Sequence, residues 1–240
     1  MWDTTEDPRI LLAERTCRYF ENILANAKLP GRWDRRGALE ALKKISSKVQ
    51  EMKFSYIPPA ELSRSEMAAE IQKKTARILE CLGGEGWAER FLEAAKREER
   101  GRVEEHISRI RFSLNILYNL PARLALGEVS EPAYAVDIRA GRILSASAHP
   151  GRKELTLCKV SMGRALTVIT NVKGVEEGAT YAISLLPPRR IGGVLSEGMF
   201  LGSEDGLLKV EKGEGELLRR VEDKYLKEVR REVLTFIRGD

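Results

Sequence analysis

The hydrophobic residues of this chain change their spacing near residue 130. Before that point they recur every three or four positions, the spacing of one face of an α-helix. After it, short runs rich in Val, Ile and Leu are separated by glycine, a pattern typical of strands joined by turns. From Leu217 to Ile237 the helical spacing returns. We therefore predict a helical bundle domain over 1–130, a β module over 131–211 and a C-terminal helix over 212–240.

Start and stop signals divide the first region into six predicted helices. Pro8 directly after Asp7 is typical of a helix start, because the first turn does not need its missing N–H. The capping box Ser63-Arg64-Ser65-Glu66 predicts another start, and Gly83-Gly84 predicts the end of that helix. The six segments are expected at about 7–27, 39–52, 63–82, 86–100, 103–117 and 122–126.

The second region contains five short runs with strand character. They are expected at 135–147, 154–162, 165–171, 180–186 and 196–201. Five short strands in so small a module favour a closed barrel of the OB-fold type. The fold class is therefore α+β with two domains, a helical bundle followed by a five-stranded OB-fold barrel, and with an amphipathic helix at the C-terminus. That last helix carries one apolar stripe, which must pack on the bundle, the barrel or a second subunit.

Composition narrows the function classes. The 240 residues carry a net charge of +5, which permits a polyanionic partner without requiring one. No apolar run approaches the roughly 20 residues of a membrane span, and the acidic N-terminus is unlike a secretory signal. The three cysteines are far apart, so we expect a reducing, cytoplasmic setting. His106 has no second histidine nearby, and no nucleophile–base set is visible, so we expect no metal, no cofactor and no catalysis.

Four sequence elements in order carry a family resemblance. They are Val136-Asp137-Ile138-Arg139-Ala140-Gly141-Arg142-Ile143-Leu144; His149-Pro150 with Leu155; Ile169-Thr170-Asn171-Val172 with Glu177-Gly178; and Leu186 and Pro188 through Ser196-Glu197-Gly198-Met199. Together they resemble the OB-fold tRNA-binding domain family, found at the C-terminus of methionyl-tRNA synthetases, near the N-terminus of phenylalanyl-tRNA synthetase β subunits and in free-standing proteins. The helical region, including Gly31-Arg32-Trp33-Asp34, resembles the N-terminal half of an archaeal group with this architecture.

The resemblance, with the basic turns of the module, indicates candidate RNA contacts. The turn after His149-Pro150 is more basic than in most members of the family, and Gly192 stands where many members have a cation. Arg139 and Arg142 are three apart on a strand, so only one of them can face a groove. The candidate nucleic-acid-binding residues are Arg139, Arg152, Lys153, Asn171, Lys173, Arg189, Arg190, Ser196, Glu197 and Met199.

Structural alternatives remain open for several of these residues. Met199 would equally fill the barrel, Ser196 would satisfy a backbone group, and Asn171 would form a turn. Arg189 and Arg190 would be solvated turn residues, and His149 is a turn residue more readily than a catalytic one. Each alternative assigns the side chain to the fold and not to a ligand.

The function expected from the resemblance is non-catalytic tRNA binding. Few aromatic residues lie in the module, which favours recognition of RNA shape and backbone over base stacking. We expect tRNA as the partner, with an aminoacyl-tRNA synthetase as the protein assisted, and a homodimer formed through the last helix or the outer face of the barrel. The alternative is a chaperone or assembly factor that binds polypeptide through the OB-fold and the C-terminal helix.

Overall fold

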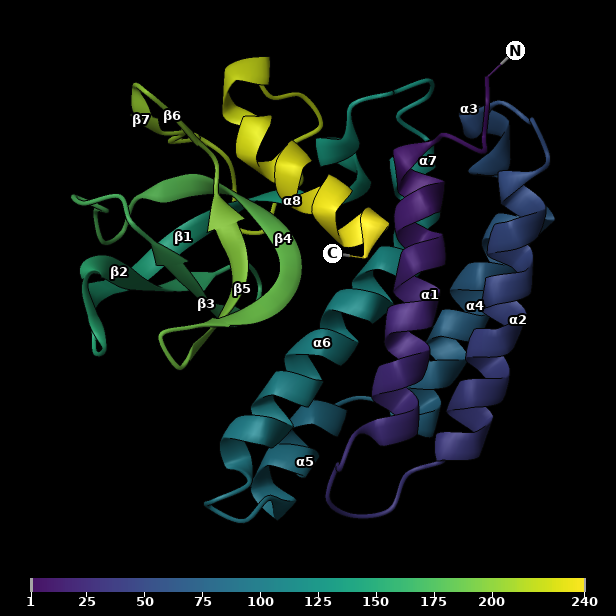
Figure 1. The fold of residues 1–240 in the computed structure, drawn as a ribbon, viewed down its shortest axis with the longest axis horizontal. Coiled ribbons are helices and arrows are strands. Elements are labelled where there is room, and N and C mark those ends of the chain that lie inside the picture. The colour runs from purple at the N-terminus through teal and green to yellow at the C-terminus, as the bar shows by residue number, and fades with distance from the viewer. Residues whose placement is uncertain (1, 240) are drawn as a thin grey trace. The chain divides into compact units, whose positions relative to one another are not determined.

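The computed structural model describes residues 2–239 and places them in two compact units (Figure 1). The first unit ends at Ser130, and the second begins at Glu131. The described part of the chain is thus a two-domain α+β protein, as the change in hydrophobic spacing predicts. None of the described helices combines the length and the apolar character needed to cross a bilayer.

Seven α-helices make up the first unit within the described residues. They are α1 (Pro8–Asn26), α2 (Arg35–Lys53), α3 (Pro59–Leu62), α4 (Glu66–Cys81), α5 (Trp87–Ala94), α6 (Arg100–Tyr118) and α7 (Leu120–Leu124). The predicted start of α1 is confirmed, because the Asp7 carboxylate accepts a hydrogen bond from the Arg9 N–H and Pro8 opens the helix. Two details differ. Helix α3 has no predicted counterpart, and Ser65 caps α4 in place of Ser63.

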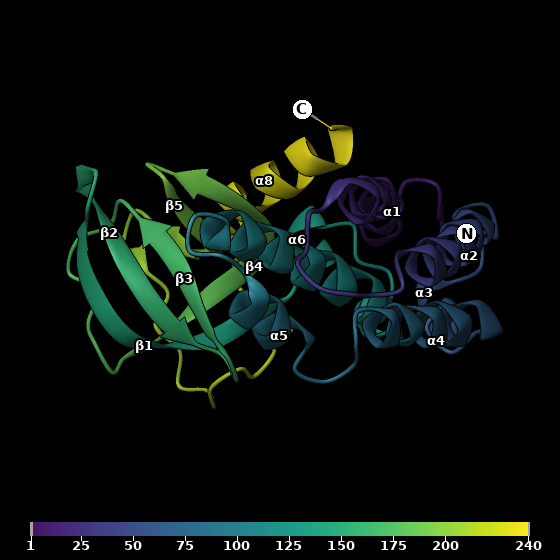
Figure 2. The same cartoon turned by 90° about the horizontal axis from the view of Figure 1, so that it is seen from below.

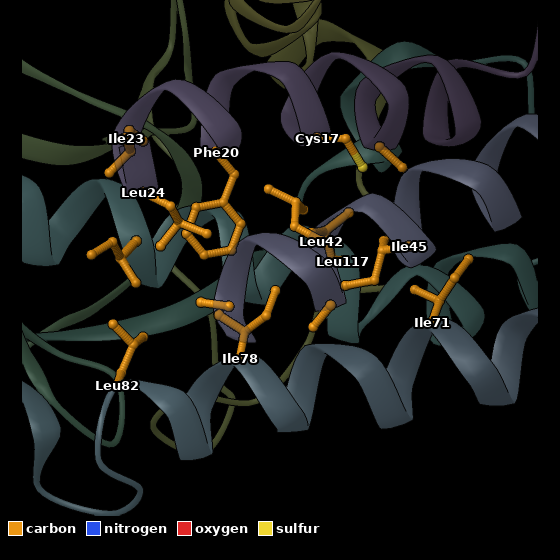
Figure 3. Close-up of a cluster of buried hydrophobic side chains, with 14 of the residues drawn as sticks. Cys17, Phe20, Ile23, Leu24, Leu42, Ile45, Ile71, Ile78, Leu82 and Leu117 are labelled. Atoms are coloured by element: carbon orange, nitrogen blue, oxygen red, sulfur yellow. The ribbon is translucent and has the colours of Figure 1, made fainter. Parts of the chain in front are cut away.

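The core of the first unit lies between α1, α2, α4 and α6 (Figure 3). Helix α1 packs on α2 and α6, and α2 packs along α4. Phe20 from α1, Ile45 from α2 and Ile78 from α4 are fully buried there. Since the apolar stripe of each helix faces this core, packing accounts for the helical spacing of the sequence.

The second unit is built on a five-stranded antiparallel sheet. Its strands are β1 (Ile138–His149), β2 (Arg152–Ser161), β3 (Ala165–Thr170), β4 (Thr180–Ile191) and β5 (Val194–Phe200), in the spatial order β3-β2-β1-β4-β5. All four ladders are antiparallel. One face carries the buried Val160, Val168, Ile183 and Phe200, which form the core of this unit.

The observed pairings do not close the sheet into a barrel. Its two edge strands, β3 and β5, lie side by side (Figures 1 and 2). The Ile169 N–H donates to the Ser196 hydroxyl across them. Among the described strands no backbone ladder joins these two edges. The five-stranded sheet is therefore observed, and closed-barrel geometry stays a prediction.

The segment after β5 corrects the predicted C-terminal helix. A small hairpin, β6 (Gly202–Ser203) and β7 (Gly206–Leu207), comes first. The chain then runs beside the sheet: the Val210 N–H donates to Thr180 O, and the Leu218 N–H donates to Ile138 O. The apolar residues from Leu217 onward thus begin as extended chain, and helix α8 covers only Lys227–Arg238.

Helix α8 is anchored to the second unit itself. It contacts β4 and the short 3-10 helix η1 (Pro132–Ala135), and a second 3-10 helix, η2 (Asp223–Tyr225), precedes it. Arg230 pairs with Glu131 and with Asp223, and these hydrogen bonds raise the pKa of its guanidinium. On the apolar side of α8, Val229 and Val233 are buried. The bundle, the barrel and a second subunit are the three predicted packing partners of this helix. The structure shows that α8 contacts the sheet of the second unit.

Candidate nucleic-acid interface

Two tight hairpins carry most of the predicted cations. The β1–β2 hairpin turns through Pro150-Gly151, with His149 opposite Arg152. The β4–β5 hairpin turns through Gly192-Gly193, whose φ values are 55° and 87°. Two positive φ angles in a two-residue turn are typical of type I′, which glycine adopts without strain. Both turns are therefore short.

The side chain of His149 joins the two hairpins. It is buried, with 2% of its surface exposed. Its Nε2 lies 2.9 Å from Ile191 O on the β4–β5 hairpin, and its Nδ1 accepts a hydrogen bond of 3.1 Å from the Gly151 N–H. A carbonyl can only accept and an N–H can only donate, so the ring carries its proton on Nε2 and none on Nδ1. His149 thus lies between the two turns.

We call three exposed cations beside the two turns the basic rim: Arg152, Lys153 and Arg190. The stem of Arg152 passes Gly192, since a Cβ at Gly192 would lie 3.4 Å from Arg152 Cγ. Arg190 donates a 2.8 Å hydrogen bond to Gly193 O. Within residues 2–239 no ion pair engages Arg152 or Lys153. The rim therefore offers positive charge that the described chain does not neutralise at those two positions.

Arg189 is directed elsewhere. It neighbours Arg190 on β4, and adjacent strand residues point to opposite faces. Its guanidinium pairs with Glu232 of α8 at 3.1 Å. The arginine doublet is therefore divided, with Arg190 on the rim and Arg189 on the side that faces α8.

Arg139 is also engaged by the fold. Its guanidinium binds the buried Asp137 carboxylate at 2.7 Å and donates to Gly215 O at 3.0 Å. These contacts hold the extended segment after β7 against β1. The structure does not bring Arg139 together with the basic rim.

The Ser196–Met199 motif lies along β5. Ser196 is buried and its hydroxyl accepts from Ile169 N–H and donates to Gly198 O, which is the structural alternative foreseen for this residue. Glu197 pairs with Arg164 at 3.1 Å. Met199 is partly buried opposite Ser184. The Ser196 hydroxyl is thus satisfied within the unit, whereas Glu197 is ion-paired with Arg164 but its buried Oε1 accepts no hydrogen bond from the described residues.

Asn171 and Lys173 are exposed in the loop that follows β3. The loop begins beside β2, where the Thr156 hydroxyl donates to Val172 O at 3.4 Å. No ion pair involves Lys173 in the part of the chain that the structure describes. These two residues supply polar surface outside the two hairpins.

Sequence reasoning predicted His149 as a turn residue, but it missed the contact of this ring with the second hairpin and the space that Gly192 leaves for it. The His-Pro dipeptide signals a turn, but nothing in its neighbourhood signals a contact with Ile191, which lies 42 residues away.

For metals, the described residues contain no group of three His, Cys, Asp or Glu side chains that could hold an ion. Burial, and after it the neighbouring Arg109, lower the pKa of His106.

Comparison with known proteins assigns both units to described families. Residues 1–127 match a family described as "Alpha helical domain", and residues 138–224 match one described as "Putative tRNA binding domain". The phenylalanine–tRNA ligase beta subunit of Moorella thermoacetica is 34% identical over 91 residues, which cover 32% of this chain and 11% of that protein. The match thus spans a small part of that relative. A crystal structure of a MetRS related protein from Pyrococcus horikoshii covers 38% of this chain and 96% of that chain, with 23% identity and a TM-score of 0.34.

Proposed function

The chain belongs to the alpha helical domain family through residues 1–127 and carries a tRNA-binding domain over 138–224, and from this premise we propose that it is a non-catalytic tRNA-binding protein. The second unit holds folded RNA by its shape and phosphate backbone. We also assign the sheet to the OB-fold, on the support of the neighbouring edge strands β3 and β5. The region 131–211 is the binding module.

The observation that carries this proposal is the basic rim on two contacting hairpins. Phosphate contacts need cations, and they provide most of the affinity without reading sequence. Arg152 and Lys153 have no acidic partner in residues 2–239, so binding a phosphate there breaks no existing ion pair. The two-residue turns, joined through His149, leave little loop to be ordered when the rim binds RNA.

The aromatic residues of the sheet support backbone recognition over base stacking. Tyr181 and Phe200 are buried and pack edge to face, with ring centroids 5.8 Å apart. The Tyr134 hydroxyl exchanges hydrogen bonds with the backbone of Val221. Since single-strand readers stack bases on exposed rings, this sheet suits the contour of a structured RNA better.

A salt titration of tRNA binding tests the proposal. Fluorescence anisotropy with unfractionated tRNA should give binding at low salt that weakens as salt rises, because counterions are released from the phosphates. The Arg152→Ala/Lys153→Ala/Arg190→Ala variant should bind more weakly, with a salt slope reduced by about one per lost phosphate contact.

The matched control for this titration is Arg142→Ala. Arg142 is exposed on the same strand as His149 but pairs with Ser161 and Thr180 at the other end of the sheet, about 20 Å from the rim. Its removal lowers the net charge without touching the rim. Absence of tRNA binding at low salt, or equal losses for Arg142→Ala and a single rim substitution, would overturn the proposal.

The protein partner and the cell compartment follow from the same family relationship. We propose an aminoacyl-tRNA synthetase as the protein assisted, a cytoplasmic location, and a homodimer. Because Val229 and Val233 of α8 are already buried, the outer face of the sheet is the better dimer surface, with Leu144 exposed there. The same burial disfavours α8 as a site for binding unfolded polypeptide.

A further inference from the structure

His149 makes two hydrogen bonds of opposite sense to two separate hairpins. The ring donates from Nε2 to Ile191 O at 2.9 Å and accepts at Nδ1 from Gly151 N–H at 3.1 Å. Both partners are backbone groups within two residues of a rim cation, Arg152 on one hairpin and Arg190 on the other. With 2% of its surface exposed, the ring has almost no contact with water.

We infer that His149 is a positioning residue, which fixes the spacing of Arg152 and Arg190 so that both cations meet neighbouring phosphates of the bound RNA. This inference rests on the proposed tRNA binding. The ring touches no RNA itself. It acts by holding the two turns at one separation, so that this separation need not be fixed at the moment of binding.

The packing around the ring supports this role. A Cβ placed on Gly192 would lie 2.6 Å from His149 Cε1, so the ring occupies the space that any other residue at 192 would fill. The same Cβ would lie 3.4 Å from Arg152 Cγ. The ring and the stem of Arg152 therefore both lie beside Gly192, on the side where a Cβ would stand.

Two conservative variants separate the two hydrogen bonds. The amide oxygen of asparagine can replace Nδ1 as an acceptor, whereas the amide nitrogen of glutamine can reach the position of Nε2 as a donor. Only His149→Gln can therefore keep the link to Ile191 O. His149→Asn can keep the local bond to Gly151 but not the bond between hairpins.

A double-mutant cycle on tRNA affinity tests the inference. In the full-length protein, His149→Ala and His149→Asn should weaken binding about tenfold, and His149→Gln should stay within about threefold of wild type. In an Arg152→Ala background the further loss from His149→Ala should fall below about threefold, because the cation that the ring positions is gone. When His149→Ala is combined with Arg142→Ala, the two fold-losses in tRNA affinity should multiply, since Arg142 is remote from the ring.

The outcomes distinguish the inference from the proposed function. If the wild-type protein does not bind tRNA, both the proposed function and the inference about His149 are wrong. If wild type binds and His149→Ala costs nothing, or costs the same factor with and without Arg152, the inference is overturned and tRNA binding stands. Nitrogen NMR of the wild-type ring provides a readout independent of the folding of any variant: a ring with no proton on Nε2 to donate to Ile191 O would also overturn it.

Discussion

Replacing Gly192 by alanine perturbs the contact between the two hairpins without removing any charge. The added Cβ would lie 2.6 Å from His149 Cε1 and 3.2 Å from its Nε2, closer than ordinary van der Waals contact. Gly193→Ala is the matched control, because that residue also has a positive φ, of 87°, and its Cβ would have no heavy atom within 4 Å. Both variants place an alanine at a positive φ, which is unfavourable, and only Gly192→Ala displaces the His149 ring.

The magnitude follows from the displacement required. Restoring ordinary contact moves the ring by about 0.8 Å, which takes the 2.9 Å bond from Nε2 to Ile191 O beyond hydrogen-bonding range and strains the bond to Gly151. Alanine at positive φ costs about 1–2 kcal/mol in either variant. The lost bond to Ile191 and the strained bond to Gly151 each cost about 1 kcal/mol, so Gly192→Ala should destabilise the hairpins by about 2 kcal/mol more than Gly193→Ala.

Hydrogen exchange followed by mass spectrometry measures this difference locally. A difference of about 2 kcal/mol should speed exchange of the β4–β5 hairpin peptides about thirtyfold in Gly192→Ala relative to Gly193→Ala. Tryptophan fluorescence serves as an internal control, since Trp2, Trp33 and Trp87 all lie in the first unit and should unfold unchanged.

The reasoning would be refuted by exchange that is equally fast in both variants, or faster in Gly193→Ala. Backbone strain would then explain the whole effect, because φ is further from the usual left-handed value at Gly193 than at Gly192. The ring would in that case adapt to the added methyl group at no measurable cost.

Three further predictions concern the rest of the fold. Ser196→Ala removes the acceptor of a buried N–H, so it should destabilise the second unit by about 1–3 kcal/mol and expose the Ile169 amide to exchange; unchanged protection of that amide would contradict this. Phe20→Ala should lower the free energy of unfolding of the first unit by about 3–5 kcal/mol by urea titration, and leave tRNA affinity under native conditions within twofold. Burial raises the pKa of the Cys17 thiol from 9.0 to about 12, so the unfolded chain loses this proton first and stability should fall as pH rises from about 9 to 12; a Cys17→Ala variant with the same alkaline slope would contradict it.

Local signals predicted most of the secondary structure. Asp7 with Pro8 marks the start of α1 because capping chemistry involves neighbours in sequence. The five strands follow alternation and glycine turns for the same reason. The cap of α4 shows where local signals fail. Ser63 and Ser65 are both suitable N-cap residues by type. Because α3 ends at Leu62 and Ser63 follows it directly, Ser65 is the residue that caps α4.

Contacts between residues far apart in the sequence determine the features that the local pattern did not predict. The apolar spacing from Leu217 onward is helical, yet the Leu218 N–H is bonded to β1 and Gly215 has a φ of 78°, so the sheet overrides the local preference. In the site, strand alternation separates Arg189 from Arg190 once both lie on β4 and not in a turn. The His149–Ile191 contact depends on how two hairpins meet, which no local pattern encodes.

Mapping the RNA contact by NMR is the most direct test of tRNA binding through the basic rim. Amide and side-chain resonances of isotope-labelled full-length protein would be followed as unfractionated tRNA is added. The account predicts that the largest shifts and broadening occur at 150–153 and 190–193, with little change near Arg142. Perturbations centred on the helices of the first unit, with the two hairpins unaffected, would contradict it.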